Sequence, residues 1–96
     1  MKKCDKPRNR YIMFKVLSEI ENFENYIYKE FLKFFGEYGF SKIGFKIIEY
    51  NNNVGIIRCR REYMEKVVGF LALVSEPRIK TIKVSGSLKK LREYTN

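Results

Sequence analysis

The sequence has 96 residues, 45% of them hydrophobic, which is enough for one domain with a single modest core. Its 20 lysines and arginines outnumber its 11 aspartates and glutamates, giving a formal net charge of +9, and it contains no histidine. The charge favours a polyanionic partner, nucleic acid first, and the lack of histidine removes the commonest general base and metal ligand.

The positive charge is unevenly distributed. Residues 1–18 hold six basic residues and one acid, and residues 39–96 hold twelve basic residues and five acids, whereas residues 19–38 hold two basic residues and five acids. An electropositive face should therefore be built from the beginning and the end of the chain. The simpler alternative is a basic exterior that is solvated and has no specific partner.

The chain should begin with a flexible arm. Residues 1–9 are polar and basic and contain a proline, whereas residues 10–94 read as one continuous domain. Residues 11–17 are rich in β-forming side chains and predict the first strand. Its alternation puts Ile12 on the core side and Lys15 on the outer side.

A long helix is predicted next. Apolar and aromatic residues recur three or four apart over residues 22–38, with Asn22 as the N-cap and Gly39 as the residue that ends the helix. So many aromatic side chains could also form a platform for stacking bases. A stripe of this spacing is more typical of a core, since burial of each aromatic contributes about 2–3 kcal/mol, and we assign it to the core.

A hairpin follows the helix. Residues 42–50 predict the second strand, with Phe45 on one face and Ile48 and Tyr50 on the other. Asn51 to Asn53 predict the turn, because asparagine tolerates positive φ angles.

The third strand is predicted over residues 54–60 and ends in two arginines on one face. Arg58 and Arg60 alternate with Ile57 and Cys59, so the arginines should stand outside while Cys59 is buried as a free thiol. The opposite parity would bury unpaired guanidinium groups at a large cost in free energy.

The rest of the chain predicts a helix, a strand and a short helix. The second helix begins at Arg61 or the next residue, and Gly69 in its middle suggests close packing on the sheet or on a helix. Residues 79–85 form the fourth strand, with Ile82 and Val84 on the same side. Residues 88–94 form a short basic helix.

This order predicts an α+β fold, a ferredoxin-like or RRM-like β-α-β-β-α-β sandwich with a short C-terminal helix. Two helices should cover one face of a four-stranded antiparallel sheet and leave the other face open. Apolar residues on that face, at Ile48, Tyr50 and Ile56, indicate that part of it is a protein contact or is covered by the final helix. The first and third strands should be central, which places Met13 and Lys15 beside Ile56 and Arg58 on the open face.

Motifs for catalysis are not found in the sequence. It has no Gly-rich phosphate loop and no Gly-x-Ser-x-Gly motif, and Cys4 and Cys59 are too far apart for a zinc site of the usual spacing. We expect the polypeptide alone to be non-catalytic.

The sequence has no apolar signal segment and no apolar run of the ~20 residues needed to span a bilayer, so we expect a cytoplasmic protein without membrane contact.

RNA binding suits the sequence better, through phosphates rather than bases. The RRM motif places aromatics after a glycine of the third strand, but here Ile56 and Ile57 follow Gly55. Basic side chains therefore imply contacts to phosphate and to RNA shape. The candidate RNA-binding residues are Arg8, Arg10, Lys15, Arg58, Arg60, Arg61, Lys83, Lys89, Lys90 and Arg92.

Four segments of the chain carry a family resemblance. RYIMFKV at 10–16, GIIRC at 55–59, LALVS at 71–75 and IKVSGSLKKL at 82–91 together resemble archaeal ribonuclease P protein component 2, which is related to a eukaryotic Pop subunit. The resemblance implies an RRM-like fold and a subunit of the ribonucleoprotein endonuclease that removes the 5′ leader of precursor tRNA.

The resemblance also implies partners. The RNA subunit of ribonuclease P holds Mg²⁺ and performs the hydrolysis, so no cofactor is expected on the protein. The expected partners are ribonuclease P RNA, ribonuclease P protein component 3 and, through the holoenzyme, precursor tRNA; self-association stays open. Two alternatives remain from the residues alone, a generic ribosome-associated RNA-binding domain and an acylphosphatase-type module that binds a small anion.

Overall fold

A computed structural model describes residues 8–74 and 77–95. The elements in chain order are β1 (Asn9–Val16), α1 (Phe23–Ile43), β2 (Lys46–Asn51), β3 (Val54–Arg60), the 3-10 turn η2 (Arg61–Tyr63), α2 (Met64–Leu73), β4 (Ile79–Ser85) and α3 (Leu88–Thr95). The predicted α+β sandwich is confirmed. Residues 1–7, which make up most of the predicted arm and include Cys4, lie outside the described residues.

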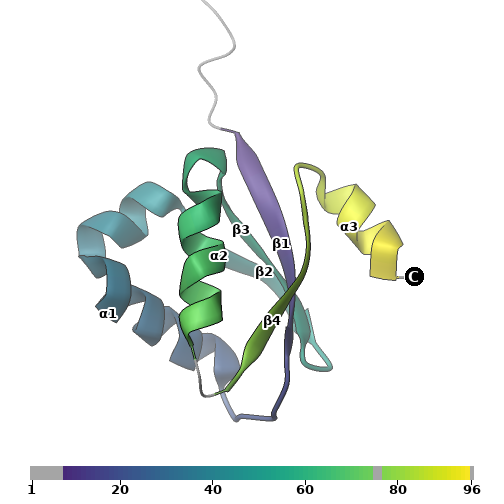
Figure 1. Ribbon diagram of the computed structural model, residues 1–96, viewed down its shortest axis with the longest axis horizontal. Coiled ribbons are helices and arrows are strands. Elements are labelled where there is room, and N and C mark those ends of the chain that lie inside the picture. Colours follow the sequence, from purple (N-terminus) through teal and green to yellow (C-terminus); the bar gives the residue numbers. More distant parts are fainter. Residues whose placement is uncertain (1–7, 75–76, 96) are drawn as a thin grey trace, which may run out of the picture.

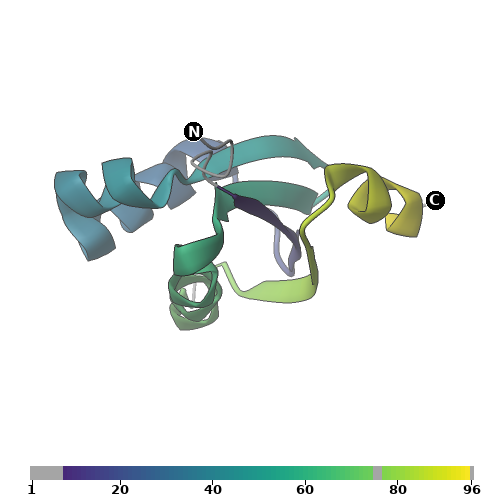
Figure 2. The same cartoon turned by 90° about the horizontal axis from the view of Figure 1, so that it is seen from above.

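The four strands form one antiparallel sheet in the order β2-β3-β1-β4, with β1 and β3 central as predicted. Helices α1 and α2 lie on one side of the sheet and α3 on the other (Figures 1 and 2). Ile12, Phe14 and Val16 of β1 and Ile57 and Cys59 of β3 are buried in the core under α1 and α2. The predicted parity of both central strands is therefore confirmed.

Phe31 of α1 lies at the centre of this core. Its ring stacks on Phe45 with centroids 4.0 Å apart and meets Phe40 and Phe70 edge-on at 5.6 and 5.1 Å. The core assignment of the aromatic stripe is confirmed for its first half. Among the later positions Phe35 packs on the core, but the prediction is wrong for Phe34 and Tyr38, which are 56% and 75% exposed.

The predicted end of α1 at Gly39 is also wrong. The helical segment continues to Ile43, but Gly36 interrupts it with a φ of 77° and a ψ of 172°, and Gly44 ends it with a φ of 68°. Glycine adopts these positive φ values without the strain that a Cβ would bring. The kink at Gly36 turns the last part of the segment back, so that Ile43 reaches the core.

A bulge in β2 changes which face its last residues occupy. Ile47 pairs with Ile57 and Glu49 with Ile56, so Ile48 has no partner of its own. Beyond such a bulge the alternation of side chains is reversed. The prediction that Tyr50 faces away from the core is therefore wrong: its ring stacks on Phe23, with centroids 4.8 Å apart.

Gly55 lies opposite Tyr50 where no side chain has room. A Cβ at Gly55 would lie 2.6 Å from the ring of Phe14 and 2.8 Å from the backbone oxygen of Glu49. The glycine thus lets the Phe14 ring lie directly on the β3 backbone.

The other sheet face is not fully open, because α3 covers its middle; of the two alternatives for its apolar residues, coverage by the final helix is confirmed at Ile56. Leu91 is fully buried against Met13 and Ile56, with Tyr11 and Leu88 packed around them.

A second bulge lies in β4, where Met13 pairs with Lys83 but Phe14 pairs with Thr81. The intervening Ile82 has no strand partner, is 36% exposed and lines a cleft beside α3, away from the core to which Val84 turns.

The prediction that Gly69 marks close packing of α2 on a neighbouring element is wrong. It is exposed, and a Cβ built on it meets nothing within 4 Å.

We therefore expect Gly69→Ala to raise the free energy of unfolding by about 0.5–1 kcal/mol, measured by urea denaturation, since alanine favours the helix. Gly36→Ala is the matched control: its Cβ also meets nothing, but its φ of 77° should make the change destabilising. Equal effects of the two changes would contradict this assignment.

Candidate nucleic-acid interface

Five of the predicted RNA-binding residues come together where β1 begins and β3 ends, at the top of the sheet in Figure 1. Asn9 pairs with Arg60, Tyr11 pairs with Arg58, and the Arg61 amide donates to the carbonyl of Arg8 at 2.8 Å. Arg10 lies opposite the core residue Cys59, so it is on the other face of the sheet from Arg58 and Arg60. We name this end of the sheet the arginine end; it carries Arg8, Arg10, Arg58, Arg60 and Arg61.

Two glycines make room for arginine side chains at this end. A Cβ at Gly44, just before β2, would lie 3.4 Å from Cγ and Nε of Arg60. A Cβ at Gly86, just after β4, would lie 3.0 Å from Nη1 of Arg10, which donates to the carbonyl of Asn9 at 3.1 Å. The two arginines therefore lie over the glycines that flank the two edge strands.

Lys46 extends the cluster and was not among the predicted RNA-binding residues. It is exposed and pairs with Arg58, which in turn pairs with Tyr11. Directly opposite residues of neighbouring strands share one face of a sheet, so a lysine and an arginine stand side by side here. The alternation of β2 already indicated this face for Lys46, but only the sheet order places it next to Arg58.

The arginine end is free of ion pairs to any described residue. The two ion pairs within residues 8–74 and 77–95 join Lys33 to Glu30 and Arg92 to Glu49. Guanidinium groups without a carboxylate partner can form paired hydrogen bonds to phosphate oxygens. The arginine end can therefore bind a polyanion without first breaking an internal ion pair.

The other predicted residues lie on or beside α3. Lys89 and Lys90 are exposed in the first turn of α3, which follows Gly86 and so lies next to the arginine end. Cations in the first turn oppose the helix dipole, so helix stability does not explain them. Arg92 donates to Glu49 at 3.0 Å, whereas Lys83 lies nearer the middle of the sheet, paired with Met13.

Lys15 lies at the opposite end of the sheet. It pairs with Val54, beside the β2–β3 hairpin, and with Lys80 of β4. Of the predicted set, the arginine end and the start of α3 lie at one end of the sheet, whereas Lys83 lies near its middle and Lys15 near the hairpin, beside the unpredicted Lys80.

A family model and several curated relatives match this chain. A family model described as "Rpp14/Pop5 family" matches residues 10–96. This chain belongs to the Rpp14/Pop5 family. The family predicted from the sequence is confirmed.

Several archaeal relatives named ribonuclease P protein component 2 match most of the chain. The Pyrococcus horikoshii protein is 35% identical over 88% of this chain and 80% of its own length. The Methanocaldococcus jannaschii protein is 33% identical over 88% and 70%, and the Methanobrevibacter smithii protein is 30% identical over 90% and 87%.

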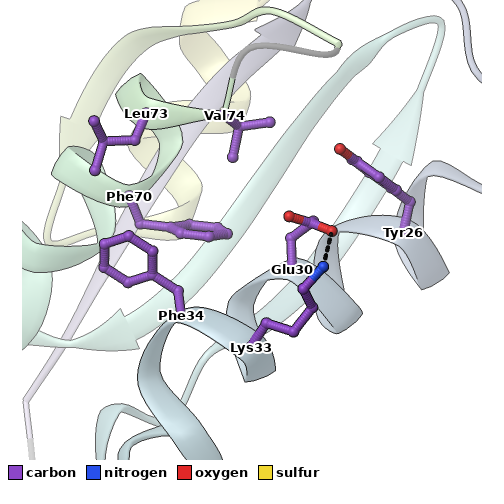
Figure 3. A pocket seen from close by; sticks show the side chains of 7 residues that line it. All are labelled: Tyr26, Glu30, Lys33, Phe34, Phe70, Leu73 and Val74. Atoms are coloured by element: carbon purple, nitrogen blue, oxygen red, sulfur yellow. Dashed lines mark hydrogen bonds and ion pairs between the residues drawn. The ribbon is translucent and has the colours of Figure 1, made fainter.

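The helical side of this Rpp14/Pop5 chain carries a groove between α1 and α2 with both apolar and polar side chains in its walls (Figure 3). Phe34 and Phe70 meet edge-on at 5.6 Å, and Leu73, which is 67% exposed, lines the groove from α2. Glu30 and Lys33 form an ion pair of 3.4 Å on its α1 wall. The groove encloses about 500 Å³. Exposed apolar side chains in a concave surface are typical of a protein contact.

Buried titratable groups of this Rpp14/Pop5 chain are held neutral. Burial raises the pKa of the Cys59 thiol to about 11, so at neutral pH it is not a nucleophile. Burial, followed by the charges of Glu19 and Glu24, raises the pKa of Tyr50. Among the described residues, no three His, Cys, Asp or Glu side chains gather as metal ligands would, and no described helix is long and apolar enough to cross a membrane.

Proposed function

We propose that this chain is the component 2 subunit of ribonuclease P, the ribonucleoprotein that removes the 5′ leader of precursor tRNA, and that its arginine end contacts ribonuclease P RNA. The proposal rests on a cluster of arginines in a member of the Rpp14/Pop5 family. None of these arginines forms an ion pair with a described residue. On this proposal the RNA subunit holds Mg²⁺ and performs the hydrolysis, and the complex works in the cytoplasm.

The role of the arginines follows from polyelectrolyte physics. A catalytic RNA core crowds phosphates together, and each phosphate neutralised by an arginine or lysine releases condensed cations. Five guanidinium groups at one end of the sheet would supply part of the charge that Mg²⁺ otherwise supplies. The protein should therefore lower the Mg²⁺ concentration at which the RNA reaches its active fold.

Reconstitution tests this proposal. Cleavage of precursor tRNA is measured with ribonuclease P RNA and protein component 3, with and without this chain, over a range of Mg²⁺ concentrations. We expect a higher rate and a lower Mg²⁺ requirement with the chain present. RNA binding without either gain would favour the generic RNA-binding domain and overturn the proposal. An acylphosphatase-type module would hydrolyse acyl phosphates without RNA.

We propose that protein component 3 docks in the groove between α1 and α2. The groove exposes Phe34 and Leu73, and residues 19–38 around its α1 wall hold five acids and two basic residues. An acidic surface repels RNA, so a protein segment with apolar and basic side chains is the complementary occupant.

Phe34→Glu should weaken the complex with component 3 at least tenfold, because it puts a charge into the apolar wall. The measurement is isothermal titration of component 3 into the variant, with RNA binding by the variant alone expected to be unchanged. Tyr38→Glu is the matched control, since Tyr38 is 75% exposed on the same helix but does not line the groove. Unchanged affinity, or loss of self-association in place of loss of component 3, would contradict the assignment.

A further inference from the structure

A cleft lies on the α3 side of the sheet, between α3 and the β2–β3 hairpin. Met13, Val54 and Ile82 contribute apolar surface from three strands, while Asn51 and Asn52 line it from the hairpin. Tyr94 lines it from the last turn of α3, and its volume is about 930 Å³. The cleft therefore combines an apolar surface, an aromatic ring and amide side chains.

Tyr94 is held at this cleft by the packing of α3. It lies three residues after Leu91, which is fully buried against Met13 and Ile56, so the buried turn fixes where the last turn of the helix stands. The Tyr94 side chain is 56% exposed, and the ammonium of Lys83 lies 5.1 Å from its ring centroid. The ring is thus positioned from within the protein but accessible from outside.

The charge around the cleft is positive. Lys15 lines the cleft and pairs across the sheet with Lys80, and Lys83 lies beside Tyr94. Glu49 also lines the cleft, but its carboxylate accepts a hydrogen bond from Arg92 at 3.0 Å. A partner that brings both a flat apolar ring and a negative charge suits these groups.

We infer that this cleft binds one unpaired nucleotide of an RNA, with its base stacked on Tyr94 and its phosphate near Lys15 and Lys80. The inference rests on the proposed function as an RNA-binding subunit and adds a subsite distinct from the arginine end. Base stacking on an aromatic side chain accepts any base, and the Asn51 and Asn52 amides can bond to base edges. α3 covers the central strands on which RRM domains stack bases, and it supplies an aromatic ring of its own.

A tryptophan reporter tests the stacking. The chain contains no tryptophan, so Tyr94→Trp gives a single fluorophore at the cleft. The probes are a single-stranded oligoadenylate and an RNA duplex, each about ten nucleotides long, within the usual site size for single-strand binding. We expect the single strand to quench the fluorescence and the duplex, whose bases are already stacked, to leave it nearly unchanged. Tyr38→Trp, exposed on the helical side, is the matched control and should not be quenched by either probe.

Affinity measurements separate the ring from the charges. Tyr94→Leu should weaken binding of the oligoadenylate about tenfold while Tyr94→Phe retains it, since only the leucine removes the stacking surface. Neither change should alter the salt dependence, whereas Lys15→Gln with Lys80→Gln should reduce it. Equal affinities of all Tyr94 variants, or quenching of Tyr94→Trp by component 3 and not by RNA, would overturn the inference. The proposed function would still stand in that case if the chain supports cleavage in the reconstitution, and it fails only if the cleavage gain is missing.

Discussion

Replacing Phe31 by alanine is expected to lower the free energy of unfolding by about 3–5 kcal/mol, measured by urea denaturation. Phe31 is fully buried and its ring lies 4.0 Å from that of Phe45, with Phe40 and Phe70 edge-on around it. Alanine would leave a cavity bounded by rings that come from α1, from α2 and from Phe45, the residue just before β2. These rings are held by three separate elements, so they cannot collapse into the space together.

Phe34→Ala provides the matched control for this prediction. It removes the same side chain from the same helix, one turn later, but Phe34 is 56% exposed and packs only partly on Phe35 and Phe70. A loss of less than about 1 kcal/mol is expected, because most of the ring is in water in both states. Similar losses for the two variants would show that the core is not centred on Phe31.

The elements that local chemistry determines were predicted well from the sequence. The bounds of β3 and β4 agree with the predicted strands over 54–60 and 79–85. The asparagine turn is confirmed, since Asn52 and Asn53 have φ angles of 54° and 65°. Asparagine tolerates this conformation, and alternating apolar residues on both sides leave only one register for a two-residue hairpin.

The end of α1 could not be predicted because three glycines offer a stop. Gly36, Gly39 and Gly44 all permit a positive φ, but only Gly36 and Gly44 adopt one. Which glycine breaks the helix depends on whether the following residues can reach the core, and this is a property of the tertiary packing.

The bulges were hidden from the sequence for a related reason. A strand with one extra residue has the same composition as a regular strand, so strict alternation put Tyr50 outside although it stacks on Phe23. In β4 the extra residue is Ile82, which lines the cleft at Tyr94.

The arginine end was predicted in part. Alternation in β3 predicted Arg58 and Arg60 on one face, whereas the contact between Arg8 and Arg61 was not predicted and is seen only in the structure. Tyr94 was not among the predicted site residues, because the sequence indicates a short basic helix over 88–94 but not where its last turn lies on the sheet. Its cleft exists because Leu91 packs that helix against Met13 and Ile56, and the sequence indicates an apolar anchor at Leu91 but not these long-range partners.

Replacing Arg58 and Arg60 together by alanine is expected to weaken RNA binding on the order of 50-fold near ~0.1 M salt and to reduce the salt slope by about 1.8, if each arginine neutralises one phosphate. Both side chains are half-buried without an ion pair to a described residue, so the fold should remain. The measurement is RNA affinity at several salt concentrations, with circular dichroism as the check on folding.

The salt slope identifies the cause of any loss of affinity. Lys29→Ala with Lys33→Ala removes the same charge from the helical side, so it should leave the slope nearly unchanged if binding depends on the arginine end and not on net charge. Arg58→Lys with Arg60→Lys should keep the slope but lose part of the affinity, because lysine neutralises a phosphate without the paired hydrogen bonds of a guanidinium. An alanine variant with weaker binding and an unchanged slope would mean that Arg58 and Arg60 position other groups and do not themselves contact phosphate.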